Sequence, residues 1–211
     1  MKRISLLFVL VLALSAIASA NIIPSLISGS PTGTGPFTWT YDFQLSGDQN
    51  ALVGAAPSLG TTGTVVSNTF AGLGAFVTIY DFAGYNGTCG GPLGWTCTAQ
   101  ATGYTPTLVN PTDNAGLVNI TWTHTSGADV IGGGLGSSTD LGNFTAQSIY
   151  GVPVLGMYAS RAVKNTSGAA GTIGSNVGNL TVPNVPEPAT MGLIGIGLVG
   201  LGLLRRRVRK S

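Results

Sequence analysis

A single histidine and two cysteines are the side chains of this sequence best suited to chemistry. His124 is followed closely by Ser126 and Asp129, residue types that nucleophilic hydrolysis combines. Neighbours this close on one strand and turn rarely form such a triad, so we expect His124 to end a strand without a catalytic role. Cys89 and Cys97, even with the distant histidine, supply too few ligands for a tetrahedral metal site. The sequence therefore predicts neither a catalytic centre nor a metal centre in these residues.

The carboxylates are scattered along the chain. Glycoside hydrolysis needs two carboxyl groups that flank the scissile bond, and the only glutamate, Glu187, lies apart from the aspartates. A calcium site built from loop aspartates stays open, although the sequence contains no D-x-D-x-D run to support one. The aspartates are Asp42, Asp48, Asp81, Asp113, Asp129 and Asp140. A secreted hydrolase is therefore the least favoured of the functions considered.

The basic residues lie mostly at the two ends of the 211-residue chain. Between the ends, Arg161 and Lys164 oppose six aspartates, which gives this part a net charge of −4. Nucleic-acid binding needs a basic face on the folded domain, so we expect no nucleic-acid partner. Residues 195–200 match G-x-G-x-x-G, but a dinucleotide site also needs a preceding strand and a downstream acidic residue, so we expect no cofactor.

Residues 1–20 have the three parts of a secretory signal. A basic start precedes an apolar run over 4–16, and small residues then frame a cleavage site. The residues concerned are Lys2 and Arg3 at the start, and Ala18, Ala20 and Asn21 at the cleavage site. This pattern predicts export by the secretion translocon and cleavage by signal peptidase before Asn21. A retained membrane anchor or a buried helix is the alternative.

A second targeting pattern lies near the other end of the sequence. The motif Pro186-Glu187-Pro188 precedes an apolar, glycine-rich run over 189–204, and a basic tail over 205–211 follows. A helix over 189–204 would be about 24 Å long, short of the bilayer core of about 30 Å, and thinning or arginine snorkelling could cover the difference. The basic cluster favours the cytoplasmic side and consists of Arg205, Arg206, Arg207, Arg209 and Lys210.

The segment VPEPATMGLIGIGLVGLGLLRRRVRK closely resembles the PEP-CTERM sorting signal of Gram-negative bacteria. The resemblance implies that Pro186, Glu187 and Pro188 are recognised by an exosortase, a membrane cysteine protease or transpeptidase that processes the tail near the motif. It also implies an inner-membrane-anchored precursor that later reaches the cell surface or an extracellular polysaccharide matrix. A plain C-terminal membrane anchor without processing is the alternative.

The region between the two targeting segments is patterned for strands. Residues 37–45 alternate apolar and polar side chains without a break, which indicates a half-buried strand that a second sheet must cover. Further candidate strands are 62–70, 75–82, 95–101, 117–124, 143–150, 154–163 and 177–182. We therefore predict an all-β fold, an antiparallel β-sandwich or jelly-roll-like ectodomain over 37–183. A flexible leader over 21–36 would precede it, and a linker over 184–188 would carry the motif.

Export places Cys89 and Cys97 in an oxidising compartment, so we expect them to form a disulfide. The leading functional prediction is a non-catalytic, sorted surface or matrix protein. A carbohydrate-binding or adhesive module is the main alternative, and it requires an exposed aromatic row to which Trp39, Trp95 and Trp122 could contribute. Ice binding by threonines would need pairs that recur at a short fixed period, and the Thr-x-Thr pairs here are irregularly spaced.

Overall fold

The structure is a computed structural model that describes residues 21–57 and 72–186. In this part the chain forms strands and loops, and it contains no helix. The strands are β1 (Ile22–Leu26), β2 (Phe37–Ser46), β3 (Gln49–Ala51), β4 (Phe76–Ile79), β5 (Tyr85–Gly90), β6 (Trp95–Gln100), β7 (Asn119–His124), β8 (Val130–Ile131), β9 (Ser138–Ser148), β10 (Pro153–Lys164) and β11 (Ile173–Pro183). The prediction of an all-β domain is confirmed for these residues. The expected signal over 1–20, the strand over 62–70 and the tail from Glu187 onward lie outside the described residues.

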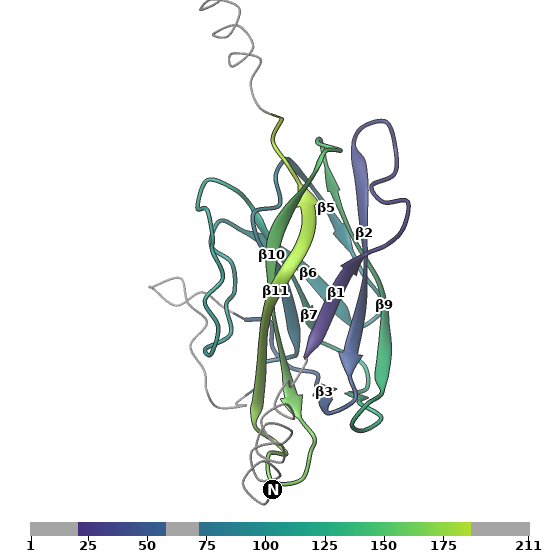
Figure 1. The fold of residues 1–211 in the computed structure, drawn as a ribbon, viewed down its shortest axis with the longest axis vertical. Helices are drawn as coiled ribbons and strands as arrows, with labels where there is room; N and C mark the ends of the chain where they lie inside the picture. Colours follow the sequence, from purple (N-terminus) through teal and green to yellow (C-terminus); the bar gives the residue numbers. More distant parts are fainter. Residues whose placement is uncertain (1–20, 58–71, 187–211) are drawn as a thin grey trace, which may run out of the picture.

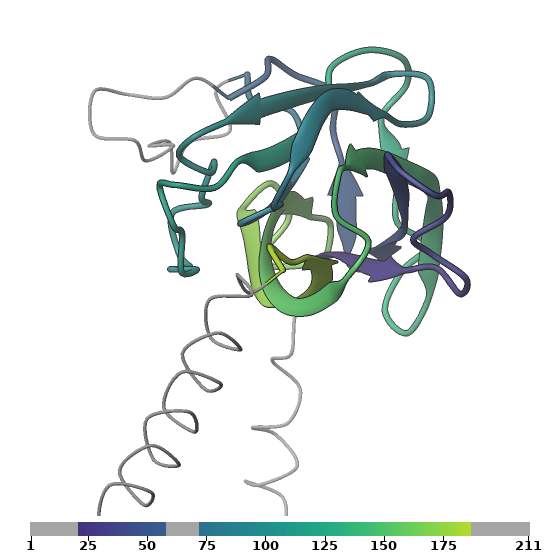
Figure 2. The ribbon, with the colours of Figure 1, turned by 90° about the horizontal axis from the view of Figure 1, so that it is seen from above.

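The strands form two antiparallel sheets. A four-stranded sheet has the order β1-β2-β9-β5. The second sheet has the order β6-β7-β4-β10-β3-β8, and β11 pairs with β10 off this path. Every strand pair of the two sheets is antiparallel, as the sequence predicts. Figure 2 shows how strongly the long β10–β11 pair curls at one side of the molecule.

The two sheets share one hydrophobic core. The alternating side chains of β2 supply Trp39, Tyr41, Phe43 and Leu45, and none of them is exposed to solvent. Phe43 packs edge-on against Trp122 of the second sheet, with ring centroids 5.7 Å apart. Such aromatic pairs add to the hydrophobic gain from burial. The inward face predicted for 37–45 therefore does pack against a second sheet.

The predicted flexible leader over 21–36 is wrong for its first residues, which form β1. Ile22 and Pro24 are buried against β2 while Ile23 points outward, a short period-two pattern that the neighbouring prolines and glycines hide. Pro24 is tolerated because β1 is an edge strand with only β2 as its partner. Asn21 is also fixed, since its carbonyl accepts a hydrogen bond from the Ser46 amide at 2.9 Å. Asn21, the residue expected to follow the cleavage site, is therefore part of the folded domain.

Candidate functional site

The chain leaves the folded domain directly into the sorting motif. Strand β11 ends at Pro183, and the amide of the next residue, Asn184, donates a hydrogen bond of 2.8 Å to the carbonyl of Val152. Val185 and Pro186 follow as exposed residues. Figure 1 shows this exit at the end of the molecule where β10 begins. Pro186, the first motif residue, is thus presented to solvent right beside the last paired strand.

The structure describes only some of the other predicted site residues. Asn21 is described and buried. The remaining cleavage, motif and basic-cluster residues lie outside the described residues: Ala18, Ala20, Glu187, Pro188, Arg205, Arg206, Arg207, Arg209 and Lys210.

Several exposed aliphatic side chains lie at the same end of the domain as the exit, and the sequence gives no sign of them. The turn between β9 and β10, the start of β10 and the chain after β11 together expose five aliphatic side chains. We call this surface the tail-proximal patch, and its members are Ile149, Val152, Val154, Leu155 and Val185. Leu155 is 70% exposed, although it is a large aliphatic residue. Exposed apolar side chains that form a contiguous patch can mark a contact with another molecule or a membrane.

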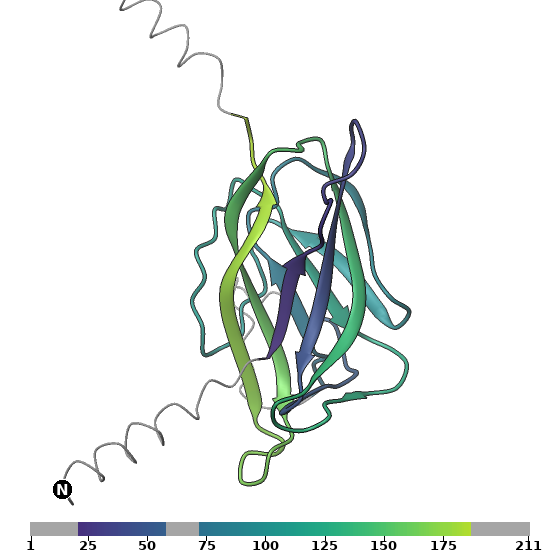
Figure 3. The ribbon, with the colours of Figure 1, turned by 45° about the vertical axis from the view of Figure 1, so that its right-hand side comes forward.

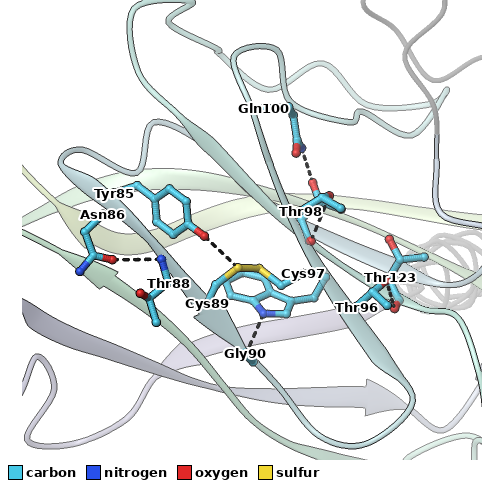
Figure 4. Close-up of a disulfide and its surroundings, with 12 residues drawn as sticks. Tyr85, Asn86, Thr88, Cys89, Gly90, Thr96, Cys97, Thr98, Gln100 and Thr123 are labelled. Carbon is cyan, nitrogen blue, oxygen red and sulfur yellow. Dashed lines mark hydrogen bonds between the residues drawn. A yellow bond between two sulfur atoms is a disulfide. The ribbon is translucent and has the colours of Figure 1, made fainter.

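The disulfide predicted between Cys89 and Cys97 is present (Figure 4). Cys89 lies on β5 of the four-stranded sheet and Cys97 on β6 of the other sheet, so the bond links the two sheets. Tyr85 donates a hydrogen bond from its hydroxyl to the Cys89 sulfur at 3.1 Å. The indole of Trp122 donates to the carbonyl of Gly90 at 2.9 Å, which ties the same corner to the core. The disulfide therefore has a structural position.

Removing the disulfide in the variant Cys89→Ala/Cys97→Ala is expected to lower the free energy of unfolding by about 2–3 kcal/mol. The bond closes a short loop in the unfolded chain, and the chain-entropy model gives this value for a loop of that length. Urea unfolding of the variant and of the oxidised parent would measure the difference. Treating the parent with a reductant should reproduce it. An unchanged unfolding midpoint after reduction would show that the bond does not restrict the unfolded chain as expected.

His124 lies in a packed structural environment. Its side chain is 3% exposed and stacks on Trp95 with ring centroids 5.0 Å apart. Nδ1 of the imidazole lies 3.1 Å from the carbonyl oxygen of Ala51. The Asp129 carboxylate accepts a hydrogen bond of 2.7 Å from the backbone amide of Val53. The histidine ends β7, as predicted, and its described contacts are those of a packing residue.

The three tryptophans do not form an exposed row. Trp39 and Trp122 have no exposed surface, and the Trp39 indole donates a hydrogen bond to the Tyr150 carbonyl at 3.1 Å. Trp95 is half-buried and packs against His124 and Phe144. Two of the three tryptophans considered for sugar binding therefore lie in the core.

A polar network that the sequence does not reveal holds the irregular segment 101–118 against the second sheet. The Asn119 side chain donates to the Asp113 carboxylate at 2.9 Å and accepts from the Asp81 amide at 2.9 Å. The Asp81 carboxylate in turn accepts from the Asn114 amide at 2.8 Å. Burial raises the pKa of the Asp81 carboxyl, the Asn114 hydrogen bond opposes this, and the nearby Asp113 charge adds to the rise. The network uses these two carboxylates to hold the segment.

The variant Asp81→Asn is expected to be more stable than the parent at pH 7, by less than about 1 kcal/mol because the carboxyl is only partly buried and solvent screens its charge. Asparagine keeps the acceptor for Asn114 and tolerates the left-handed backbone at this position, where φ is 56°. Because the pKa of the Asp81 carboxyl is raised in the folded state, ionisation of this carboxyl destabilises the parent fold. This destabilisation is present above the raised pKa and absent below about pH 4, so the advantage of asparagine should disappear there. Urea unfolding at both pH values measures the effect, and an advantage that persists at low pH would contradict it. Asp81→Ala should instead lose about 1–2 kcal/mol, since alanine disfavours this backbone.

A cavity of about 300 Å³ lies between the first residue of β5, the last residues of β6 and the segment 115–118. Its lining is mostly small and apolar, and Tyr85 is its one ionisable residue. Burial raises the pKa of the Tyr85 phenol, so the hydroxyl stays protonated at neutral pH. The cavity wall therefore carries no ionised group.

Within residues 21–57 and 72–186, no helix is long and apolar enough to cross a membrane. The same residues contain no group of three or more metal-binding side chains of the histidine, cysteine, aspartate and glutamate types. No curated protein and no solved structure was found to match the chain. The profile of the PEP-CTERM protein-sorting motif does match, over residues 184–207. This stretch begins at the residue hydrogen-bonded to Val152 and includes Pro186, Glu187, Pro188 and the first arginines of the basic cluster. The chain is therefore a protein with a PEP-CTERM sorting domain.

Proposed function

We propose that this chain is a non-catalytic surface or extracellular-matrix protein that an exosortase sorts through residues 184–207. The motif match carries the proposal, because this motif indicates an exported protein that depends on an exosortase. In this proposal the translocon exports the chain, signal peptidase removes 1–20, and residues 189–204 hold the precursor in the inner membrane. The exosortase then acts near Pro186, Glu187 and Pro188, and the domain reaches the cell surface or the surrounding polysaccharide.

The folded domain is compatible with a location outside the cytoplasm. A disulfide between Cys89 and Cys97 links its two sheets, and disulfides of this kind persist in oxidising compartments. Its two antiparallel sheets with a shared aromatic core support a β-sandwich of the jelly-roll type. The packing of His124 and the backbone hydrogen bond of Asp129 support a role without catalysis.

The experiment that tests this proposal is fractionation of the native host with and without its exosortase. We expect the domain in the surface or medium fraction of the parent strain, and in the inner-membrane fraction of the deletion strain. A second exported protein without the motif serves as the control and should not move. Identical distributions of the domain in both strains would refute exosortase-dependent sorting.

The carbohydrate-binding alternative would need aromatic side chains that present a flat ring to solvent. Trp95 is the one tryptophan of the three with partial exposure, and its ring stacks on His124. The observed burial of Trp39 and Trp122 therefore favours the structural proposal over this alternative.

A further inference from the structure

The exit of the chain places one end of the domain within a short distance of the expected membrane segment. Only four residue steps separate Val185 from Ala189, where the apolar run begins. A fully extended chain covers at most about 14 Å in four residues. The headgroup layer occupies about 5–8 Å of that distance on each side of the hydrocarbon core. Whichever surface surrounds Val185 therefore lies at or beside the headgroups while the run is inserted.

The shortness of the apolar run would bring Val185 still closer to the hydrocarbon core. A helix over 189–204 would be about 6 Å shorter than the hydrocarbon core. A short span draws its flanking residues inward or thins the bilayer. The segment between Val185 and the run contains Glu187 and two prolines. With such a helix inserted, the mismatch would draw the tail-proximal end of the domain toward the lipid surface.

The surface found at this end suits a lipid interface. It consists of the tail-proximal patch defined above, with Leu155 as its most exposed aliphatic side chain. Segments 149–160 and 165–186 contain no charged residue, so contact of these segments with lipid would desolvate no charge of their own. The charged residue Asp81 follows β4, which pairs with β10 near its start. Figure 3 shows the start of β10 and the end of β11 together where the chain departs.

We propose that the tail-proximal patch rests in the lipid headgroup layer while the tail is inserted, so that the precursor stands on the membrane in a fixed orientation. This inference rests on the membrane anchoring in the proposed function. Contact of the aliphatic side chains with the interface adds to the hold of a short, glycine-rich span. The opposite end of the domain, which carries the loop 132–137, then points away from the membrane by the length of β10, about 35 Å.

Site-directed spin labelling of the full mature chain in lipid vesicles tests the inference. Three single-cysteine variants, Leu155→Cys, Leu135→Cys and Leu198→Cys, are labelled with the native disulfide kept oxidised. Leu155 lies in the patch, Leu135 is an 82% exposed leucine of the opposite end, and Leu198 lies in the expected span. The accessibility of each label to oxygen, which concentrates in lipid, is compared with its accessibility to a water-soluble nickel complex.

The inference predicts an oxygen-to-nickel accessibility ratio at residue 155 that is several-fold higher than at residue 135, and highest at residue 198. A lipid signal at 198 with a water signal at 155 would overturn the docking and leave the anchoring intact. A water signal at 198 would refute the anchoring and the docking with it. A label at 155 shielded from both reagents would show a protein contact in place of lipid, and would also overturn the proposal.

Discussion

Replacing the motif in the variant Pro186→Ala/Glu187→Ala/Pro188→Ala is expected to abolish removal of the tail in the native host. The two prolines restrict the backbone, and the glutamate supplies the only side-chain carboxylate of residues 141–211. An enzyme that recognises this segment would lose both the shape and the charge of its substrate. Pro186 is exposed at the end of the domain, so the change should leave the fold intact. An immunoblot against the domain would show the full-length precursor in place of the processed form.

The matched control is Thr190→Ala, which alters the tail two residues beyond the motif and keeps the motif itself. This variant should be processed like the parent. The triple variant should also behave identically in strains with and without the exosortase, because the substitution already removes the recognition. Normal processing of the triple variant would mean that Pro186, Glu187 and Pro188 are not recognition residues.

Trp122→Ala is expected to lower the free energy of unfolding by about 3–5 kcal/mol, the usual cost of removing a buried tryptophan. Trp122 is fully buried, and its ring packs against Phe43 at 5.7 Å and Phe144 at 6.0 Å. The substitution also leaves the Gly90 carbonyl without its indole donor. Because domains of this kind are stable by only about 5–15 kcal/mol, the loss would bring the protein close to unfolding. Urea unfolding followed by circular dichroism would measure it.

Two further variants keep this prediction testable if the alanine variant does not fold. Trp122→Phe retains an aromatic ring and should cost clearly less than alanine. Leu135→Ala changes an 82% exposed side chain and should stay within about 0.5 kcal/mol of the parent. A free energy of unfolding of Trp122→Ala that lies within about 1 kcal/mol of the parent value would contradict a core shared by the two sheets.

The sequence predicts the strands whose side chains alternate and misses those that lack a long alternation. Residues 37–45 match β2 because their inward face is buried by the second sheet. Strand β1 escapes prediction because its pattern is short and contains Pro24, and strands β3 and β8 are too short to show a period. Strand β9 begins at Ser138, earlier than its apolar residues indicate, since pairing with β2 extends it through polar positions.

The candidate site divides in the same way. The sorting motif is readable from the sequence because an enzyme would recognise it as a linear segment, and residues 184–207 match its profile. The tail-proximal patch is not readable, since Ile149 and Leu155 look like core residues until the fold leaves them exposed. Trp39 and Trp122 show the opposite case, because the sequence allows them as exposed sugar-binding residues and the fold buries them. Burial depends on contacts between distant strands, which local periodicity does not contain.

The most direct test of the sorting proposal is the intact mass of the mature protein recovered from the native host, with and without its exosortase. The proposal predicts a mass that spans Asn21 to near Glu187 in the parent strain and a retained tail in the deletion strain. Extra mass on the processed form would identify a lipid or sugar transferred during sorting. A mass that runs to Ser211 in both strains would contradict the proposal and make the tail a simple anchor.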